Sequence, residues 1–560
     1  MAHATFAEML LARAGDDRPG LLFEDESRTW AEVVREARRR AGLLAALAPA
    51  PPGRPSPGRR PAHVGVLLEN VPEYVFWIGA AALAGATVVG INPTRRGAEL
   101  AADIRHTDCD LIVTDPGRAG LLDGLDTGVP DGRVLLTGSA AYAAALPEPA
   151  DPVPADPADR LLLLFTSGST GAPKAVACGQ GRLAAIARHA ERMGITRDAV
   201  TYAAMPLFHG NAVMANLAMA VHAGAAVALR RRFSASGFLP DVRRYGVTYF
   251  NYVGRALAYI LATPERPDDA DNTLQALFGT EASAQDLAGF AARFGCRVIE
   301  GYGSSEGAIS LRKTPDTPPD ALGVPQEGVE VAVLDPESGA ECERARFDAG
   351  GGLLNPGAAI GEIVGLNAAG AFEGYYNNPE ADAERVRDGK FWSGDLGYRD
   401  AEGYFYFAGR SSDRLRVDSE NFAAAPVERI LSCWDPVVMC AVYPVPDPRT
   451  GDQVMAALEL RDGRPFDAGA FAAFLAARPD LGTKWAPRFV RIVGAMPLTA
   501  TGKVDKRPLR KARWDVPGGG EDVWWRPGRA LAYEPLTPEQ AGALREEFRA
   551  NGRAHVLTTL

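Results

Sequence analysis

The stretch Phe165-Thr-Ser-Gly-Ser-Thr-Gly-Ala-Pro-Lys174 says most about the fold of this chain. It follows the apolar run 161–164, which predicts a buried strand. The loop offers several hydroxyls, two glycines that let backbone N–H groups turn toward an anion, and a terminal cation. Its spacing differs from GxxxxGK[ST], so it predicts a phosphate-binding loop of another kind. A Ser/Gly-rich surface turn is the competing interpretation.

Lysine is rare in this chain. Only seven of its 60 basic residues are Lys, and the others are Arg. A Lys at the end of a Gly-rich loop therefore stands out, because a compact ammonium on a flexible stem differs chemically from a planar guanidinium. Lys174 is the candidate cation of the loop.

The composition limits the class of protein. With 560 residues the chain predicts more than one domain. Its 47% hydrophobic and 23% charged residues are typical of a soluble globular protein. The net charge of −10 and the pI near 5.4 argue against a dedicated nucleic-acid binder.

Cysteine and histidine spacing predicts no metal site. The six cysteines show no CxxC pattern and the seven histidines no HExxH pattern, so reduced thiols in a cytoplasmic protein are expected. The start lacks the basic and apolar regions of a secretory signal. The uncharged segment 74–94 is long enough to span a bilayer, but it divides at Gly85. We expect a buried helix over 73–84 and a strand over 86–91 instead, hence no integral membrane segment.

Strands and helices alternate in the first half of the sequence. The first 50 residues predict mainly helix, with a strand or turn over 23–29 and a helix from Trp30. Apolar runs predict strands at 63–68, 87–91, 111–114, 134–136 and 161–165. This alternation is typical of a mostly parallel α/β sheet. Further on, 391–407 indicates hairpins, and a smaller α+β domain begins near 409–413, with a strand at 414–417 and a helix over 424–434.

Four further groups of residues carry chemistry. They are Gly301-Tyr-Gly-Ser-Ser-Glu306, Trp392-Ser-Gly-Asp395, Gly409-Arg410 with Asp413 and Arg416, and Leu498-Thr-Ala-Thr-Gly-Lys503. The first suits stacking on a base, contact with a phosphate and a Mg²⁺ ligand. The second places a carboxylate after a glycine turn, as sugar hydroxyls require. The third offers a guanidinium at a hinge, and the last repeats the hydroxyl–Gly–Lys chemistry. Each alone is also typical of a polar loop.

In this order the groups resemble the core motifs of the adenylate-forming superfamily: acyl-CoA synthetases, nonribosomal adenylation domains and luciferases. The resemblance covers about residues 10–515. Phe372-Glu-Gly-Tyr-Tyr-Asn-Asn-Pro379, Tyr404-Phe-Tyr-Phe-Ala-Gly-Arg410 and Met205-Pro-Leu-Phe-His-Gly-Asn211 resemble the bacterial branch near fatty-acid transport proteins and very-long-chain acyl-CoA synthetases.

The resemblance implies an α/β fold and a domain plan. A large N-terminal domain, 1–409, has mostly parallel sheets flanked by helices and a β-barrel-like subdomain. A small mobile α+β domain, 410–525, carries Lys503, and a tail, 526–560, follows without a predicted function. The implied reaction is ATP-dependent activation of an acid. A carboxylate attacks the α-phosphorus, pyrophosphate leaves, and a thiol, usually that of coenzyme A, displaces AMP. ATP/AMP, Mg²⁺ and coenzyme A are thus the expected cofactors and second substrate.

The resemblance also implies the residues that bind the nucleotide. They are Thr166, Ser167, Gly168, Ser169, Thr170, Gly171 and Lys174; Gly279, Thr280 and Glu281; Tyr302, Gly303, Ser304 and Ser305; and Asp395, Tyr406 and Arg410. In these implied roles, 166–174 cradles the departing phosphates, Tyr302 lies against adenine with 279–281 on its other side, and Ser305 contacts the α-phosphate. Asp395 accepts the ribose hydroxyls, with Arg410 nearby.

The implied catalytic residues are Lys503, Glu306 and Lys174. Glu306, with Thr166, would hold Mg²⁺, while Lys174 steadies the leaving group. Lys503 would bridge the carboxylate and the α-phosphate and then move away by rotation of the small domain near 412–413. Because little covalent chemistry falls to the protein, positioning and charge neutralisation dominate.

The acid is expected in a pocket lined by His209, Asn211, Tyr252, Arg255, Gly301 and Gly307. Tyr252 and Arg255 favour a polar or aromatic acid over a long alkyl chain, although Arg255 equally suits a surface ion pair. The expected partner is a small-molecule acid and not a nucleic acid, and the chain is expected to be a monomer or homodimer.

Two positions depart from the pattern of the family. Ser305 replaces the usual Thr and keeps the hydroxyl. Ser419 stands where relatives commonly have Gly, on the loop that faces the pantetheine arm. Either Ser fits after a small shift, or its Cβ narrows the passage and alters the second step. The alternative function is then that of a diazotase, which activates nitrite for attack by an aryl amine.

Overall fold

The computed structural model describes residues 3–47, 61–166, 174–253, 256–280, 282, 284–348, 353–410, 414–417, 420–449, 451–461, 464–478, 481–482, 484–499, 502–516, 522–528 and 530–557. The chain forms two compact units. The first comprises Met1–Ser310, Ala369–Val386 and Ala500–Gly502, and the second comprises Leu311–Ala368, Arg387–Thr499 and Lys503–Leu560. The expected boundaries at 409 and 525 stay predictions.

One sheet of the first unit has the strand order β6-β5-β3-β4-β7-β8. All neighbours are parallel except β7 and β8, which form an antiparallel pair. The strands are β3 (His63–Leu67), β4 (Thr87–Gly90), β5 (Leu111–Thr114), β6 (Val134–Leu136), β7 (Arg160–Thr166) and β8 (Lys174–Gly179). The helices that follow or flank them are α2 (Trp30–Leu47), α3 (Pro72–Ala84), α4 (Gly97–His106), α5 (Pro116–Ala119) and α6 (Ala140–Ala145). The five predicted strands are confirmed, and every residue of β3, β4 and β5 is buried, as is typical of parallel strands covered on both faces.

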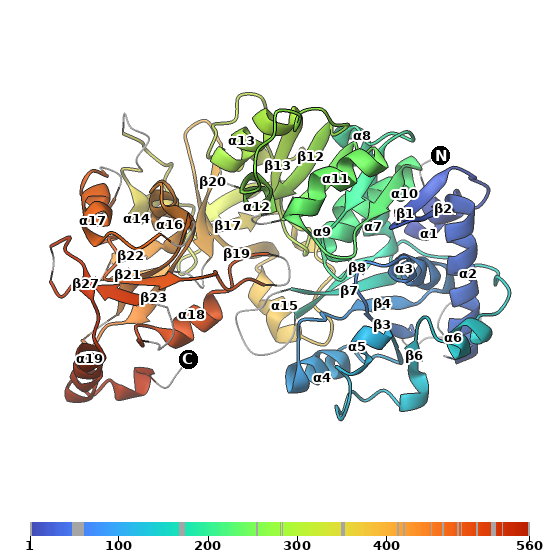
Figure 1. Ribbon diagram of the computed structural model, residues 1–560, viewed down its shortest axis with the longest axis horizontal. Coiled ribbons are helices and arrows are strands. Elements are labelled where there is room, and N and C mark those ends of the chain that lie inside the picture. The colour runs from blue at the N-terminus through green and yellow to red at the C-terminus, as the bar shows by residue number, and fades with distance from the viewer. Residues whose placement is uncertain are drawn as a thin grey trace. The chain divides into compact units, whose positions relative to one another are not determined.

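The uncharged segment after Glu73 is a helix and a strand, as predicted. Helix α3 begins at Pro72, whose fixed φ suits a first helical position, and ends at Gly85, which has φ +65°. Strand β4 follows at once, and α3 packs on β3, β4 and β7 (Figure 1). Among the described residues, we find no helix with the length and apolar character needed to cross a membrane.

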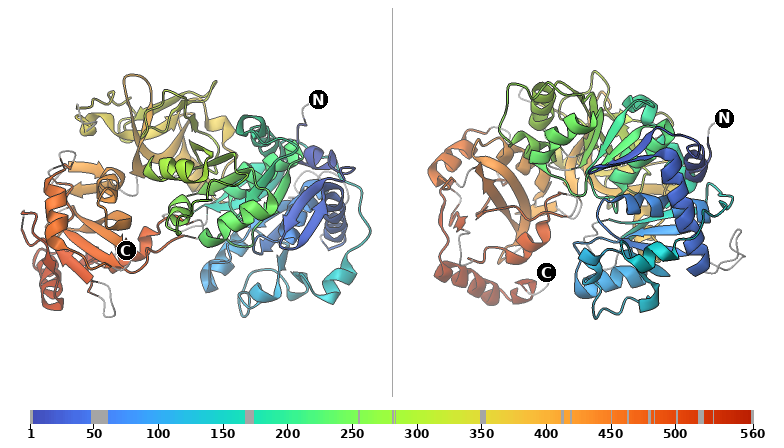
Figure 2. Two further views of the ribbon diagram at one scale, coloured as in Figure 1. Left: turned by 45° about the horizontal axis from the view of Figure 1, so that its top comes forward. Right: turned by 45° about the vertical axis from the view of Figure 1, so that its right-hand side comes forward.

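A second sheet of the first unit has the order β13-β12-β11-β9-β10-β1-β2. Its strands are β1 (Pro19–Phe23), β2 (Glu26–Thr29), β9 (Val200–Ala203), β10 (Ala226–Leu229), β11 (Tyr249–Val253), β12 (Ala276–Thr280) and β13 (Arg297–Gly303). The other helices of the first unit are α1 (Phe6–Leu11), α7 (Gln180–Ala187), α8 (Ala190–Met193), α9 (Gly210–Ala212), α10 (Ala218–Ala223), α11 (Ala235–Tyr245), α12 (Ala256–Leu261), α13 (Ala284–Phe294) and α15 (Pro379–Arg385). In both views of Figure 2 the green helices α11 to α13 lie beside these strands.

The N-terminal region contains more strand than the sequence predicts. Strand β1 pairs in parallel with β10, roughly 200 positions further along the chain, and β2 pairs antiparallel with β1. This edge of the sheet depends on a distant partner, which local helix propensity does not reveal. The helix from Trp30 is confirmed.

The second unit contains antiparallel sheets. One has the order β16-β17-β19-β18, with β20 also on β19, and β14 pairs with β15. The strands are β14 (Ser310–Arg312), β15 (Val324–Pro325), β16 (Val331–Leu334), β17 (Gly361–Gly365), β18 (Val386–Arg387), β19 (Lys390–Arg399) and β20 (Phe405–Arg410), with helix α14 (Pro356–Ala359). The hairpin expected over 391–407 is thus confirmed as the β19–β20 pair.

The remaining chain of the second unit is an α+β arrangement. The hairpin of β21 (Arg414–Val417) and β22 (Glu420–Ala423) precedes a sheet of β23 (Val437–Pro446), β24 (Asp452–Leu460), β25 (Phe489–Val493), β26 (Asp522–Trp525) and β27 (Glu534–Pro535). Its helices are α16 (Ala424–Ser432), α17 (Ala468–Ala476), α18 (Lys506–Ala512) and α19 (Pro538–Ala550). A separate core, which includes Phe422, Leu431 and Trp434, holds these elements together.

Candidate active site

The Gly-rich loop joins two paired strands of the first unit. Thr166 ends β7 and Lys174 begins β8, and the two residues face each other across the pair. Thr166 Oγ1 donates to the Lys174 carbonyl at 3.4 Å. Ser167, Gly168, Ser169, Thr170 and Gly171 lie outside the described residues. The structure therefore places the two ends of the predicted phosphate loop side by side.

Lys174 is held by a carboxylate from a segment distant in sequence. Its Nζ forms a 3.0 Å ion pair with Glu384 Oε2 on α15, and the ammonium lies 5.8 Å from the ring centroid of Tyr375. The Lys174 side chain is 12% exposed, whereas that of Glu384 is 61% exposed. A partner this exposed is readily replaced by another anion.

Glu306 lies buried against the same tyrosine. It is 8% exposed, and Tyr375 Oη donates to its Oε1 at 2.7 Å. Arg385 Nε donates in turn to Tyr375 Oη at 3.3 Å. Burial raises the pKa of the Glu306 carboxyl, but hydrogen bonds from Tyr375, the backbone and Ser304, with the charge of Arg385, outweigh burial and lower that pKa. Glu306 is therefore an ionised carboxylate at neutral pH.

Tyr375 links two of the predicted catalytic residues, and the sequence did not assign it a role. Its backbone N–H donates to Asp382 Oδ1 at 2.7 Å, which ties it to α15. That helix begins at Pro379, and its N-cap Asn378 accepts a hydrogen bond from Ala381 N. Lys174 thus lies near the ring of Tyr375, and Glu306 accepts from its hydroxyl. The signal available in the sequence was the Gly-Tyr-Tyr run at 374–376, which is part of the motif that resembles the family.

The segment from Gly301 to Gly307 continues strand β13 into a turn. Gly301, Tyr302 and Gly303 complete the strand, and Gly307 N donates to Ser304 O at 3.0 Å. Gly307 has φ +69°, and a Cβ there would collide with the guanidinium of Arg182.

Arg182 fixes the carbonyl side of this turn. The guanidinium donates to the carbonyls of Ser305 and Ala177. Ser305 thereby has a defined backbone position while its hydroxyl stays half-buried.

The predicted adenine contacts lie on neighbouring strands. Gly279 of β12 pairs with Glu300 of β13, so the ends of the two neighbouring parallel strands, with Thr280 on one and Tyr302 on the other, lie at the same edge of the sheet. Thr280 is half-buried, and Glu281 lies outside the described residues.

The residues expected to line the acid pocket lie on two elements. His209 is the N-cap of α9, is half-buried, and stands 4.5 Å from the Phe208 ring. Asn211 lies within α9 and is half-buried. Tyr252 on β11 is 0% exposed, and a Cβ on Gly279 would collide with its ring. Tyr252 thus packs in the interior, and Arg255 lies outside the described residues. The pocket role of both stays a prediction.

The second unit holds the residues predicted to bind the ribose. Asp395 in β19 faces Arg410 of β20 in register, which agrees with their expected proximity. Gly394, with φ +74°, donates its N–H to the buried Glu362 at 2.6 Å, and Ser393 Oγ accepts from Asp395 N at 3.1 Å. These contacts hold the turn that presents the Asp395 carboxylate.

Tyr406, also on β20, packs inside the second unit. Its hydroxyl donates to Asp400 Oδ2 at 2.9 Å, and its ring stacks on Tyr398 with a 4.9 Å centroid separation. Burial, assisted by Asp400, raises the pKa of Tyr406. Contact between Tyr406 and a nucleotide stays a prediction.

Lys503 of the second unit lies on a tightly closed turn before α18. Thr499 N donates to the Lys503 carbonyl at 2.7 Å, and Lys503 N donates to Thr499 Oγ1 at 3.2 Å. Asp505 N donates to Pro497 O at 2.8 Å and then caps α18. The backbone at Lys503 is therefore fixed while its side chain is half-buried.

The residues present suit Mg²⁺. Hard cations of this kind take oxygen ligands and keep several from water and phosphate, so one or two protein ligands suffice. Glu306 is ionised, and its two oxygens have more lone pairs than the hydrogen bonds from Tyr375, the backbone and Ser304 use, while the Thr166 hydroxyl retains lone pairs. These two residues would hold the ion, which would neutralise charge on the phosphates.

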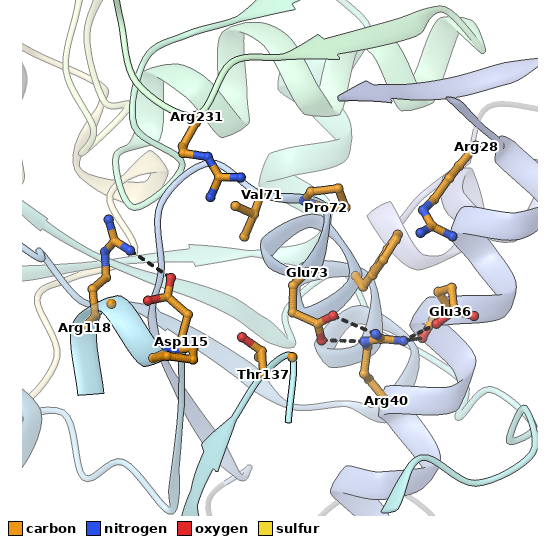
Figure 3. A pocket seen from close by; sticks show the side chains of 14 residues that line it. Arg28, Glu36, Arg40, Val71, Pro72, Glu73, Asp115, Arg118, Thr137 and Arg231 are labelled. Atoms are coloured by element: carbon orange, nitrogen blue, oxygen red, sulfur yellow. Dashed lines mark hydrogen bonds and ion pairs between the residues drawn. The ribbon is translucent and has the colours of Figure 1, made fainter. Parts of the chain in front are cut away.

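A separate cavity of about 760 Å³ lies in the first unit at the carboxyl ends of β3, β5 and β6 (Figure 3). It is lined by Arg28, Glu36, Arg40, Val71, Pro72, Glu73, Phe76, Asp115, Pro116, Gly117, Arg118, Thr137, Gly138 and Arg231. Arg40 lies between Glu36 and Glu73, and Arg118 pairs with Asp115. The other two arginines pair with Glu26 and Glu24. The charges are thus already neutralised, and none of the sequence-predicted site residues within the described ranges lines this cavity.

Comparison with known proteins identifies the family of the chain. The model of the family described as AMP-binding enzyme matches residues 10–376, and that of the AMP-binding enzyme C-terminal domain matches residues 426–503. The chain is 50% identical over 566 residues to a steroid-22-oyl-CoA synthetase of Rhodococcus jostii (strain RHA1), covering 100% of this chain and 99% of that protein. It is 45% identical over 528 residues to the medium/long-chain-fatty-acid–CoA ligase FadD17 of Mycobacterium marinum, covering 93% and 98%.

Solved structures show the same fold. ATP-bound MatB from Rhodopseudomonas palustris has a TM-score of 0.78 at 23% identity, covering 92% of this chain and 100% of that chain. The anthranilate CoA ligase AuaEII with anthranoyl-AMP has a TM-score of 0.77 at 23% identity, covering 91% and 98%. A family match across most of the first unit and an end-to-end relative of half-identical sequence leave one conclusion: the chain belongs to the AMP-binding enzyme family, whose adenylate-forming fold it shares.

Proposed function

We propose that this protein is an AMP-forming acid–CoA ligase whose acid carries its carboxyl group on a large apolar body, such as a steroid side chain. The observation that carries the adenylation chemistry is the convergence of Lys174 and Glu306 on Tyr375. A cation for the leaving phosphates and an ionised Mg²⁺ ligand are the two groups that the first step needs at one place.

The reaction proceeds in two steps. A carboxylate oxygen forms a bond to the α-phosphorus of ATP while the bond between the α-phosphorus and the bridging oxygen of pyrophosphate breaks. The thiolate of coenzyme A then attacks the acyl carbonyl, and AMP leaves. Lys503 would neutralise charge between the carboxylate and the α-phosphate, and Asp395 would hold the ribose.

The class of acid is supported by the relatives and by one local feature. The end-to-end relative is a steroid-22-oyl-CoA synthetase, and the next is a medium/long-chain-fatty-acid–CoA ligase. The helical segment after Asn211 is buried and mainly apolar, from Ala212 to Val221. An apolar acid suits such surroundings better than the polar acid that Tyr252 and Arg255 suggested.

The diazotase alternative finds no support among these relatives. CoA ligases at this level of identity favour the interpretation that Ser419, which lies outside the described residues, fits beside the pantetheine arm.

The test is a substrate panel with the full-length protein. Pyrophosphate release and acyl-CoA mass would be measured with ATP, Mg²⁺ and CoA for a C22 steroid acid, a medium-chain and a long-chain fatty acid, and benzoate. We expect acyl-CoA from the steroid acid at the highest kcat/KM. Nitrite with an aryl amine is tested for comparison. Pyrophosphate release with nitrite, and with none of the carboxylic acids, would contradict the proposal.

A further inference from the structure

A line of buried polar side chains crosses the interior of the first unit and ends at Asn211. Thr201 on β9, Asn216 and Asn251 on β11 are each 0% exposed. Thr201 Oγ1 donates to Asn216 Oδ1 at 2.8 Å, Asn216 Nδ2 donates to Asn251 Oδ1 at 2.7 Å, and Asn251 Nδ2 donates to Asn211 Oδ1 at 2.6 Å. Buried polar groups of this kind are costly unless they are paired, so the pairing fixes each amide.

The direction of donation along this line follows from one backbone carbonyl. Asn216 Nδ2 also donates to the Tyr202 carbonyl at 3.0 Å, and a carbonyl can only accept. The amide group of Asn216 must therefore present its oxygen to Thr201 and its nitrogen to Asn251. Asn251 in turn presents its nitrogen to Asn211, so Asn211 presents its oxygen inward and its Nδ2 outward.

A π-helical turn brings Asn216 into this line. Val213–Leu217 form a π-helix between α9 and α10, and Tyr249 Oη donates to the Ala215 carbonyl inside it at 3.0 Å. Wider turns of this kind are frequent at functional sites because they change which side chains face inward.

The outward end of the line lies close to the nucleotide motif. A Cβ on Gly210 would stand 3.2 Å from Ser305 Oγ, and Asn211 is the next residue, about 3.8 Å further along the chain. Asn211 Nδ2 makes no hydrogen bond to any residue that the structure describes, and the residue is half-buried. A donor amide with a fixed orientation is thus available beside the residue expected to contact the α-phosphate.

We propose that Asn211 Nδ2 donates a hydrogen bond to a carboxyl oxygen of the acid, and that Asn251 and Asn216 are positioning residues that fix this donor. The inference rests on the proposed function. The same oxygen becomes the acyl carbonyl oxygen of the adenylate, so the bond persists through the first step. Because the contact is to the carboxyl group, Asn211 recognises acids as a class and does not select among their apolar bodies.

Two variants test the donor. Asn211→Asp keeps an acceptor for Asn251 Nδ2 but replaces the outward donor by a charged acceptor, whereas Asn211→Leu removes donor and acceptor at similar volume without adding a charge. Each is expected to raise the KM for the acid about tenfold or more, because a hydrogen bond to a charged group is lost. The KM for ATP should stay unchanged, which also shows that the first unit has folded.

The acid panel separates this role from a role in selecting the apolar body. The KM for the acid should rise by a similar factor for the steroid acid, the fatty acids and benzoate. A loss with only one of them, or an unchanged acid KM in Asn211→Leu, would overturn the inference while the proposed function stands. A wild-type protein that releases no pyrophosphate with any acid would overturn both.

The role of the positioning residues is tested by a separate substitution at Asn251. Asn251→Asp replaces the donor to Asn211 by an acceptor, so the Asn211 amide turns over and presents its oxygen to the acid. We expect the acid KM of Asn251→Asp to rise as in Asn211→Asp, and the double variant to add no further loss. Additive losses would overturn the proposed relay.

Discussion

Tyr375 Oη donates a 2.7 Å hydrogen bond to Glu306 Oε1 inside the first unit, and the Lys174 ammonium lies 5.8 Å from the centroid of the same ring. One tyrosine thereby fixes the candidate Mg²⁺ ligand and flanks the candidate phosphate-binding cation. The predictions about the first reaction step follow from this arrangement.

Tyr375→Phe should raise the Mg²⁺ concentration that pyrophosphate release requires, without unfolding the protein. The ring stays, so packing against Ala381 and Val176 is kept, but the Glu306 carboxylate loses its donor. Hydrogen bonds to charged groups contribute about 1.5–3 kcal/mol, so we expect the Mg²⁺ requirement of pyrophosphate release to rise about tenfold or more. Tyr376→Phe is the matched control, because its hydroxyl donates to the exposed Asp108. Equal effects of both variants would contradict a specific role of Tyr375.

The same variant should change the pH dependence. The folded-state pKa of Glu306 is lowered, so its ionised form stabilises the fold above the ordinary carboxyl pKa, and this contribution is lost as pH falls through the folded-state pKa. In Tyr375→Phe burial remains while the main opposing hydrogen bond is gone, so the pKa of Glu306 rises. The acid limb of the pH–activity profile should therefore move to higher pH than in the wild type. A shift to lower pH, or none, would contradict the assignment.

Glu384→Gln should lower the KM for ATP. In the structure the Glu384 carboxylate forms an ion pair with the Lys174 ammonium, and a bound triphosphate must displace that carboxylate. Removing the competing carboxylate is expected to lower the KM for ATP a few-fold, while the melting temperature stays within about 1–2 °C because the pair is half exposed. Glu380→Gln, at an exposed position in the first turn of the same helix, is the control. If the KM for ATP rose in Glu384→Gln but not in the control Glu380→Gln, Glu384 would support nucleotide binding and not compete with it.

Lys503→Ala should abolish adenylate formation while ATP still binds. The lysine is expected to neutralise charge as the carboxylate attacks, which is a contribution to the transition state. Acid-dependent pyrophosphate release should fall by about 10²-fold or more, with ATP affinity by fluorescence titration unchanged. Lys511→Ala, exposed in the last turn of α18, is the control. Normal pyrophosphate release in Lys503→Ala would remove this role.

Ser419→Gly separates the two reaction steps. Adenylation should stay at the wild-type rate, because the loop with Ser419 is expected to face only the pantetheine arm. If the serine narrows that passage, CoA-dependent turnover should rise in the variant. Acyl-CoA formation and acid-dependent pyrophosphate release, measured in parallel, report the two steps, and an unchanged CoA step would show that the serine fits without cost.

Much of the local structure was predictable because it depends on neighbours in sequence. The strands Leu111–Thr114 and Val134–Leu136 have the predicted bounds, since short apolar runs between polar turns leave little choice. The π-helix at Val213–Leu217 was not predictable from a local pattern, and its Ala215 carbonyl accepts a hydrogen bond from Tyr249, some 30 positions away. Strand β1 was missed for the same reason: its partner β10 lies far along the chain.

The functional groups could be recognised in the linear sequence: the Gly-rich loop ending at Lys174, the carboxylate Glu306, the turn with Asp395 and the loop with Lys503. Their order and spacing were enough to indicate the family. Which of these groups contact and control one another became visible in the folded chain. Tyr375 reaches Glu306, Glu384 reaches Lys174, and Asn251 turns the amide of Asn211, each across a long sequence separation. The physical reason is that charge, protonation and amide orientation depend on contacts in space, which a linear pattern does not contain.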